Sequence, residues 1–119
     1  MNKQYIIIMG DMVLKKFLVL LQDINYDAPF TDEQIEEYTI GHVNHLKDLD
    51  ARGVLHLCGP LKGVDREMGM IILNALSLDE AKDYAFKDPF VVNKCYKTCN
   101  VYEINEANAE NNFLLETDE

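Results

Sequence analysis

The sequence predicts one α+β domain whose elements follow the order β-α-β-β-α-β. Its 119 residues, 48% of them apolar, can bury one core of ordinary size. Two segments begin with helix-capping patterns, at Thr31 and Ser77, and four apolar runs of strand length flank them. This order is typical of the ferredoxin-like arrangement, a four-stranded antiparallel sheet with both helices on one face.

The first core strand is predicted over residues 15–25, where the apolar run KKFLVLLQDIN ends in polar residues. Residues 1–14 form either an extra edge strand or an extension before the domain. Their apolar run Tyr5–Met9 is far shorter than the roughly 20 residues that cross a bilayer. The domain is therefore expected to span residues 15–104, with no transmembrane segment and no secretory leader.

The first helix is predicted from Asp32 to about Ala51. Thr31 is a good N-cap, and Gln34 completes a T-x-x-Q capping box. The inward positions repeat at steps of three and four residues: Ile35, Thr39, His42, Leu46 and Leu49. His42 is thus expected inside the buried stripe, whereas His45 falls on its flank and is expected to be solvated.

Two strands and a second helix follow, before a last strand. The strands are predicted over residues 54–61 and 67–76, joined by a polar loop. Ser77 is expected to cap the second helix, with Glu80 at its N3 position completing a second capping box, and Pro89 is expected to stop that helix. A short turn then leads to a final strand over residues 95–104.

With both helices on one face, the second face of the sheet has no cover within the chain. Its candidate residues are largely apolar and are drawn from the alternating sets Phe17, Val19 and Leu21, and Met70 and Ile72. Apolar patches of that size rarely stay exposed. We therefore expect a homodimer or larger homo-oligomer that packs sheet against sheet.

The charge balance limits the kinds of partner that this protein is expected to bind. The formal net charge is −10, which disfavours binding to nucleic acid or to an anionic membrane surface. Residues 105–119 are acidic and contain no basic residue, so they are expected to form a flexible tail. An alternative is that the apolar residues Phe113–Leu115 within this tail form a short element that docks on a partner subunit.

The three cysteines are an odd number, which favours a reduced, cytoplasmic setting. Cys95 and Cys99 fall in the predicted last strand, where four residues separate them by about 13 Å, too far for a disulfide. No further metal ligands flank them. The sequence also has no Gly-rich phosphate loop and no cofactor fingerprint, so neither a metal nor a cofactor is expected.

His42 and Asp88 are the candidates for proton transfer. Histidine and carboxylate pair readily for this chemistry near neutral pH, and a compact fold can bring the two together. Each also has a plain structural interpretation: His42 as a core histidine bonded to a carbonyl, and Asp88 as a turn residue before Pro89. Asp23 either faces the same pocket or ends its strand, and Tyr96 either donates to a ligand or serves as a strand former.

Three segments together resemble the YciI-like, or YCII-related, family over about residues 15–104: HVNHLKDLDARGVLHLCGPL, the GMIIL strand and KDPFVVNKCY. A helix histidine stands 17 positions before a Gly-Pro step in such proteins. The matching positions here are His42, Gly59, Pro60, Asp88, Pro89 and Phe90, together with Gln22 and Asp23 at the end of the first strand. Relatives commonly carry Ala-Gly where this chain has Asn93 and Lys94.

The resemblance implies a dimeric α+β barrel like that of muconolactone isomerases. It implies an active site around His42 and Asp88 and small, often aromatic-derived, substrates. The positions expected to bind substrate are Asp23, Gly59, Pro60, Phe90 and Tyr96.

The leading hypothesis is a cofactor-free lyase or isomerase. His42 acts as general acid/base and Asp88 orients its ring, for isomerisation or elimination on a small cyclic substrate. The alternative is a non-catalytic dimer that binds a small ligand, with the same two residues supplying only hydrogen bonds. A ligand that stays chemically unchanged favours the second hypothesis, and slow conversion favours the first.

Overall fold

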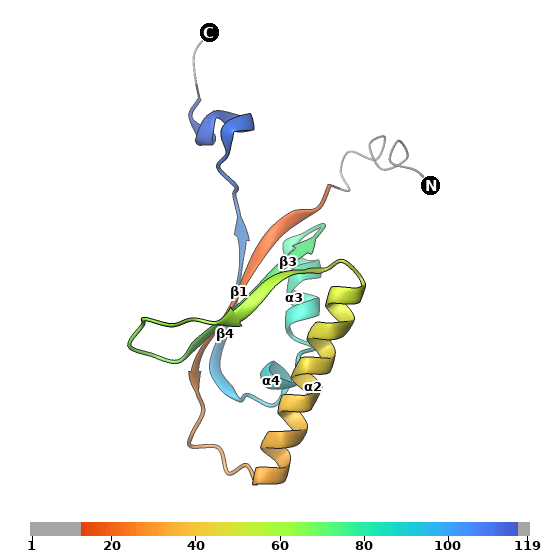
Figure 1. Cartoon of the computed structure of the whole chain (residues 1–119), viewed down its shortest axis with the longest axis vertical. Helices are drawn as coiled ribbons and strands as arrows, with labels where there is room; N and C mark the ends of the chain where they lie inside the picture. The colour runs from red at the N-terminus through yellow and green to blue at the C-terminus, as the bar shows by residue number, and fades with distance from the viewer. Residues whose placement is uncertain (1–12, 117–119) are drawn as a thin grey trace.

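The computed structural model describes residues 13–116, so most of the predicted N-terminal extension lies outside the described residues. The fold is the predicted α+β ferredoxin-like one, with four antiparallel strands in the order β2-β3-β1-β4 (Figure 1). The elements are β1 (Lys15–Ile24), α2 (Asp32–Ala51), β2 (Leu55–Pro60), β3 (Met68–Ala75), α3 (Leu78–Ala85), α4 (Pro89–Val92), β4 (Tyr96–Ile104) and a 3-10 helix (Ala109–Leu114). None of the helices within residues 13–116 has the length and apolar character needed to span a membrane.

Local capping explains where the two main helices begin. The Thr31 hydroxyl accepts the Gln34 N–H at 3.1 Å, and the Gln34 side chain accepts the Thr31 N–H at 2.9 Å, so the predicted capping box of α2 is present. At α3 the Ser77 hydroxyl caps the Glu80 N–H. The Glu80 carboxylate accepts from the N–H of Leu76, one residue before the cap, and not from that of Ser77, so the prediction of a second capping box was wrong.

Pro89 begins a helix, contrary to the prediction that it stops one. The helix α3 already ends at Ala85, and Pro89 is the first residue of the one-turn helix α4. Proline suits the first position of a helix because its fixed φ is helical and the N–H it lacks would have no partner there. Asp88 is the N-cap of this helix, in place of the short turn expected from the sequence.

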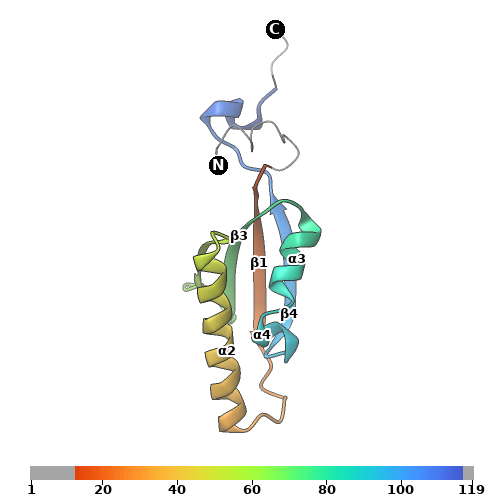
Figure 2. The same cartoon turned by 90° about the vertical axis from the view of Figure 1, so that its right-hand side faces the viewer.

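The core lies between the sheet and the helices, which lie on one side of it (Figure 2). Phe17, Val19 and Leu21 are buried there, so the assignment of these residues to the uncovered face was wrong. The intervening residues of β1 and their partners on β3 lie on the open face: Leu18 opposite Ile72 and Leu20 opposite Met70. Ile72 and Met70 were placed correctly on that face.

The helix α2 extends past the lower end of the sheet (Figure 1). Its stripe therefore changes character along its length: Leu49 is buried and Leu46 is half-buried, whereas Ile35 and Thr39 are exposed. The prediction of a continuously buried stripe was wrong for the first two turns because no strand lies beneath them.

Residues 105–116 follow β4 and run away from the domain (Figure 1). They contain the 3-10 helix Ala109–Leu114, which is capped by Asn108 through reciprocal hydrogen bonds with Asn111. The sequence interpretation did not include this helix. All of these residues are exposed, Phe113–Leu115 among them.

Candidate active site

His42 and Asp88 meet where α2 faces α4. The Nδ1 atom of His42 lies 2.9 Å from Oδ1 and 2.8 Å from Oδ2 of Asp88. The Asp88 side chain is 1% exposed and that of His42 is 17% exposed, so the pair is shielded but still reachable. Because a carboxylate only accepts hydrogen bonds, Nδ1 carries the proton, and Nε2 is the ring nitrogen left to accept one.

The backbone of α4 fixes the Asp88 carboxylate. Asp88 is the N-cap of this helix, and its side-chain Oδ1 accepts the Phe90 N–H at 2.9 Å. The backbone carbonyl of Asp88 accepts the N–H groups of Val91 and Val92, both at 2.8 Å. The carboxylate is therefore held from both sides, by the helix it caps and by the His42 ring. Its helix-capping role and its contact with His42 are compatible, as the sequence suggested.

Two aromatic rings complete the surroundings of His42. The Phe90 ring stacks on the imidazole with centroids 4.0 Å apart and planes at 13°. Tyr96 is tilted against Phe90, with ring centroids 6.0 Å apart and planes at 59°. Burial, followed by the charge of Glu67, raises the pKa of the Tyr96 hydroxyl, so this group is a protonated donor at neutral pH.

A cavity of about 350 Å³ borders these groups, and we call it the dyad cavity. Its lining includes His42, Cys58, Gly59, Pro60, Phe90 and Tyr96. Five of the sequence-predicted site residues therefore line this one cavity: His42, Gly59, Pro60, Phe90 and Tyr96. Asp88 is not in the lining but contacts His42, which is. A volume of this size suits a small ring compound.

Asp23 lies elsewhere. It is the second-last residue of β1, has a φ of 63° and forms an exposed ion pair with Arg66, whose Nε donates to Oδ1 at 3.0 Å. The hydrogen bond from Arg66 lowers the pKa of the Asp23 carboxyl. Asp23 is not among the residues that line the dyad cavity. This arrangement matches the strand-ending role that the sequence left open for it.

His45 and Lys94 adopt roles that the sequence did not predict. His45 is half-buried, and its Nε2 lies 2.9 Å from the Tyr84 carbonyl, so the expectation of a solvated residue was wrong. Lys94 has a φ of 55°, in the left-handed region that glycine adopts without cost. This chain therefore places a lysine at a turn position whose backbone conformation favours glycine.

Gly41 is a site residue that sequence reasoning missed. A Cβ atom at this position would lie 2.9 Å from Cγ and 3.3 Å from Cβ of Pro89. The missing side chain therefore lets α2 approach α4 closely enough for the adjacent His42 to reach Asp88. A glycine in the interior of a predicted helix, directly before the candidate histidine, was the available signal.

Replacing Gly41 by alanine is expected to destabilise the protein by about 1–2 kcal/mol, because overpacking at Pro89 outweighs the gain in helix propensity. Urea unfolding of Gly41→Ala measures the loss. Asn44→Ala is the matched control, since Asn44 is an exposed position on the same helix where only propensity changes. A Gly41→Ala protein more stable than the wild type would contradict the close-contact explanation.

The cysteines are free thiols in the described part of the chain: Cys58, Cys95 and Cys99. No group of three or more His, Cys, Asp or Glu side chains within residues 13–116 is placed to hold a metal ion. Burial raises the pKa of all three thiols, that of Cys99 to about 11.

Cys99 is expected to react slowly with iodoacetamide, because the thiolate is the reacting form. With a pKa of about 11, its thiolate fraction at pH 8 is about 100-fold below that of an unstructured cysteine with a pKa near 9. The rate should keep rising as the pH approaches 11. Peptide mass spectrometry after timed alkylation measures this rate, and a plateau below pH 9 would contradict the assignment.

The site and the fold together define an α+β protein of the ferredoxin-like class with a shielded His-Asp pair beside a small cavity. The YCII-related domain model matches residues 16–105, so the chain belongs to the YCII-related family. Among curated proteins, none matches this sequence.

Similar solved structures include one that shares the fold. A 5-chloro-2-hydroxyhydroquinone dehydrochlorinase from Burkholderia phenoliruptrix AC1100, solved with 2,5-dihydroxybenzoquinone, is 24% identical with a TM-score of 0.53, covering 73% of this chain and 90% of that one. A dimeric ferredoxin-like protein of unknown function from Bacteroides fragilis NCTC 9343 is 15% identical (TM-score 0.44, coverage 75% and 95%). Another, from Thermobifida fusca yx, is 12% identical (TM-score 0.46, coverage 77% and 91%).

Proposed function

We propose that this protein is a cofactor-free enzyme that moves a proton on a small cyclic substrate, with His42 as general acid/base and Asp88 as its orienting partner. The observation that carries the proposal is the double contact of Nδ1 with the carboxylate of Asp88, at 2.9 and 2.8 Å, beside a cavity. This contact fixes the ring and its tautomer, which is what a histidine base requires.

The chemistry follows from that tautomer. The Nε2 lone pair of His42 takes a proton from a ring carbon or hydroxyl of the substrate, and the freed electron pair forms a new double bond. In an elimination, that pair expels a leaving group from the neighbouring carbon. In an isomerisation, the adjacent double bond of the substrate opens, and its far carbon takes the proton back from His42. The buried carboxylate of Asp88 stabilises the imidazolium formed in between.

The substrate side of the proposal rests on the cavity. Its walls combine apolar and aromatic surface with a hydroxyl donor from Tyr96. The hydroxyl lies near Gly69, which also lines this cavity, since a Cβ built there would be in ordinary contact with the Tyr96 oxygen at 3.9 Å. A ring that carries hydroxyl or carbonyl oxygens fits such walls, because its faces meet aromatic surface and its oxygens meet a donor.

The direct test is solvent deuterium exchange. Hydroxylated and carbonyl-bearing ring compounds, with 5-chloro-2-hydroxyhydroquinone among them, are incubated with the protein in D₂O and followed by NMR and by chloride release. We expect exchange or elimination that requires an intact His42. A compound that binds in the dyad cavity while none of its protons exchanges would instead favour the non-catalytic binding module.

We further infer that two copies pair through the open sheet face. In a single chain this face leaves Leu18, Leu20, Met70 and Ile72 only half-buried, with the exposed Tyr102 beside Leu18. Contiguous apolar residues on two central strands are a surface that a second sheet covers well.

Replacing Ile72 by glutamate is expected to convert the dimer to a monomer, because a buried charge without a partner is costly at a sheet-to-sheet contact. Light scattering after size-exclusion chromatography measures the mass. Val92→Glu is the control, since Val92 is 60% exposed on α4, on the helix side of the sheet. A wild-type protein that runs as a monomer, or an Ile72→Glu protein that stays dimeric, would overturn the inference.

A further inference from the structure

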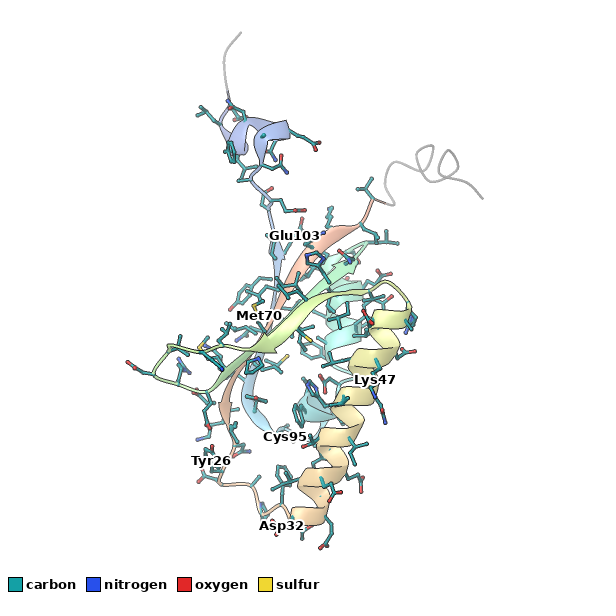
Figure 3. All side chains as sticks on the ribbon, viewed as in Figure 1. Tyr26, Asp32, Lys47, Met70, Cys95 and Glu103 are labelled. Atoms are coloured by element: carbon teal, nitrogen blue, oxygen red, sulfur yellow. The ribbon has the colours of Figure 1, made fainter. Side chains whose placement is uncertain are left out.

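A second cavity, which we call the annex cavity, adjoins the dyad cavity. It has a volume of about 420 Å³ and lies between the end of β1, the loop that follows and the first turns of α2. Tyr26, Ala28, Ile35 and Cys95 are among its lining residues. Tyr26 and Cys95 both lie in the lower half of the molecule, above the start of α2 at Asp32 (Figure 3).

The annex cavity exists because α2 continues past the end of the sheet. The same helix stripe that packs on the core at Leu46 and Leu49 continues to Thr39 and Ile35, which line the cavity instead. The connection from β1 closes the other side with Phe30 and other residues. The stripe therefore provides apolar surface at a place where the chain itself supplies little to cover it.

The walls of the annex cavity are neutral. Within the described residues its lining contains no Asp, Glu, Lys, Arg or His side chain. Three of its polar side chains are already engaged: the Thr39 hydroxyl donates to the Ile35 carbonyl at 2.7 Å, the Asn25 amide to the Lys94 carbonyl at 3.2 Å, and the Tyr26 hydroxyl to Glu67. Such walls favour a neutral apolar group over an ion.

Phe90 and Tyr96 line both cavities. The Phe90 ring has one face against the His42 imidazole, and Tyr96 stands beside it at 6.0 Å between centroids. A group in the annex cavity therefore lies one aromatic ring away from the histidine. Two hollows that share lining side chains can be occupied by two parts of one molecule.

We propose that the annex cavity binds a neutral aryl or alkyl substituent of the molecule whose polar ring lies against His42. This inference rests on the proposed function for the polar ring and goes beyond it for the substituent. It assigns a substrate class: small hydroxylated rings that carry an apolar side group. A volume of about 420 Å³ exceeds the roughly 150 Å³ of an engineered cavity that holds benzene.

The first test uses 4-fluorotoluene as a neutral probe and 4-fluorobenzoate as its anionic counterpart. Fluorine NMR gives the dissociation constants, and shifts of the backbone amides locate the site. We expect 4-fluorotoluene to perturb Ala28 and Ile35 and to bind about tenfold or more tightly than 4-fluorobenzoate, whose charge finds no partner there. Equal affinity of the two probes, or perturbation confined to the dyad cavity, would overturn the assignment.

Matched variants connect the probe to the cavity. Ile35→Trp fills the annex cavity, whereas Ile40→Trp makes the same change on the same helix at a residue that does not line it. The two positions are alike in exposure, 50% and 53%. Ala28→Leu is a second filling variant on a different segment. Both filling variants should weaken 4-fluorotoluene binding about tenfold or more, and Ile40→Trp should leave it unchanged.

The second test asks whether one molecule spans both cavities. The ratio of the dissociation constants of catechol and 4-phenylcatechol should be about ten or more in the wild type and in Ile40→Trp, and near one in both filling variants. A ratio that stays high in both filling variants would overturn the proposal.

The two proposals fail in different ways. Catechol that does not bind, with 4-fluorotoluene still in the annex cavity, would count against the proposed function and against a substrate that spans both sites. Catechol that binds while 4-fluorotoluene does not would count against the annex cavity alone.

Discussion

Replacing His42 by asparagine is expected to lower the rate of proton transfer by about 100- to 10,000-fold, the range typical for loss of a general base. The asparagine amide can donate to Asp88 in place of Nδ1, so the buried carboxylate keeps a partner and the fold is retained. Nothing at this position can then accept the substrate proton. Steady-state exchange or elimination rates on the compound identified by the deuterium screen measure the effect.

His45→Gln is the matched control for this variant. His45 lies on the same helix, but it pairs with the Tyr84 carbonyl and does not line the dyad cavity. Its replacement should change activity less than about twofold, because the glutamine amide can donate to the Tyr84 carbonyl in place of Nε2. Equal rates for the wild type and His42→Asn would remove His42 from the mechanism.

Asp88→Ala is expected to be the most destabilising single change at the site, by about 2–4 kcal/mol. The loss of the N-cap to Phe90 contributes about 1 kcal/mol. The unpaired N–H of the shielded His42 ring contributes about 1–3 kcal/mol more. Urea unfolding, monitored by circular dichroism, measures the sum.

Asp88→Asn separates the structural part of this role from the chemical part. Asparagine is as good an N-cap as aspartate, so the stability should fall by only about 1 kcal/mol. It carries no charge to stabilise the imidazolium, so the rate should still fall by about 100-fold or more. If Asp88→Asn keeps the full rate, Asp88 serves the fold alone. If Asp88→Ala loses less than about 1 kcal/mol, the cap and the ring contact matter little.

Much of the fold and part of the site could be predicted because they depend on local sequence. The two capping patterns and the alternation of apolar runs predict the order of the main elements, and α2 has the predicted bounds. His42 and Asp88 were paired because their residue types and spacing match the family, and the structure brings their side chains into contact. Their roles in catalysis stay predictions.

Other features depend on tertiary contacts between segments that are far apart in the sequence. The run FLVLL on β1 is apolar on both faces, so its sequence cannot say which set faces the helices, and the wrong set was assigned to the open face. Nor does the stripe of α2 indicate where the sheet beneath it ends. That end point decides that Ile35 lines a cavity while Leu49 is buried in the core.

Hydrogen exchange at the backbone amide of Phe90 can report on the opening of the site. This single proton is held by the same Asp88 oxygen that lies 2.9 Å from His42, at the start of a helix of one turn. A helix that short has little stability of its own and depends on the contacts around it. The hydrogen-exchange rate of this amide therefore measures how often the contacts of Asp88 with Phe90 and His42 open, and the measurement needs no known substrate.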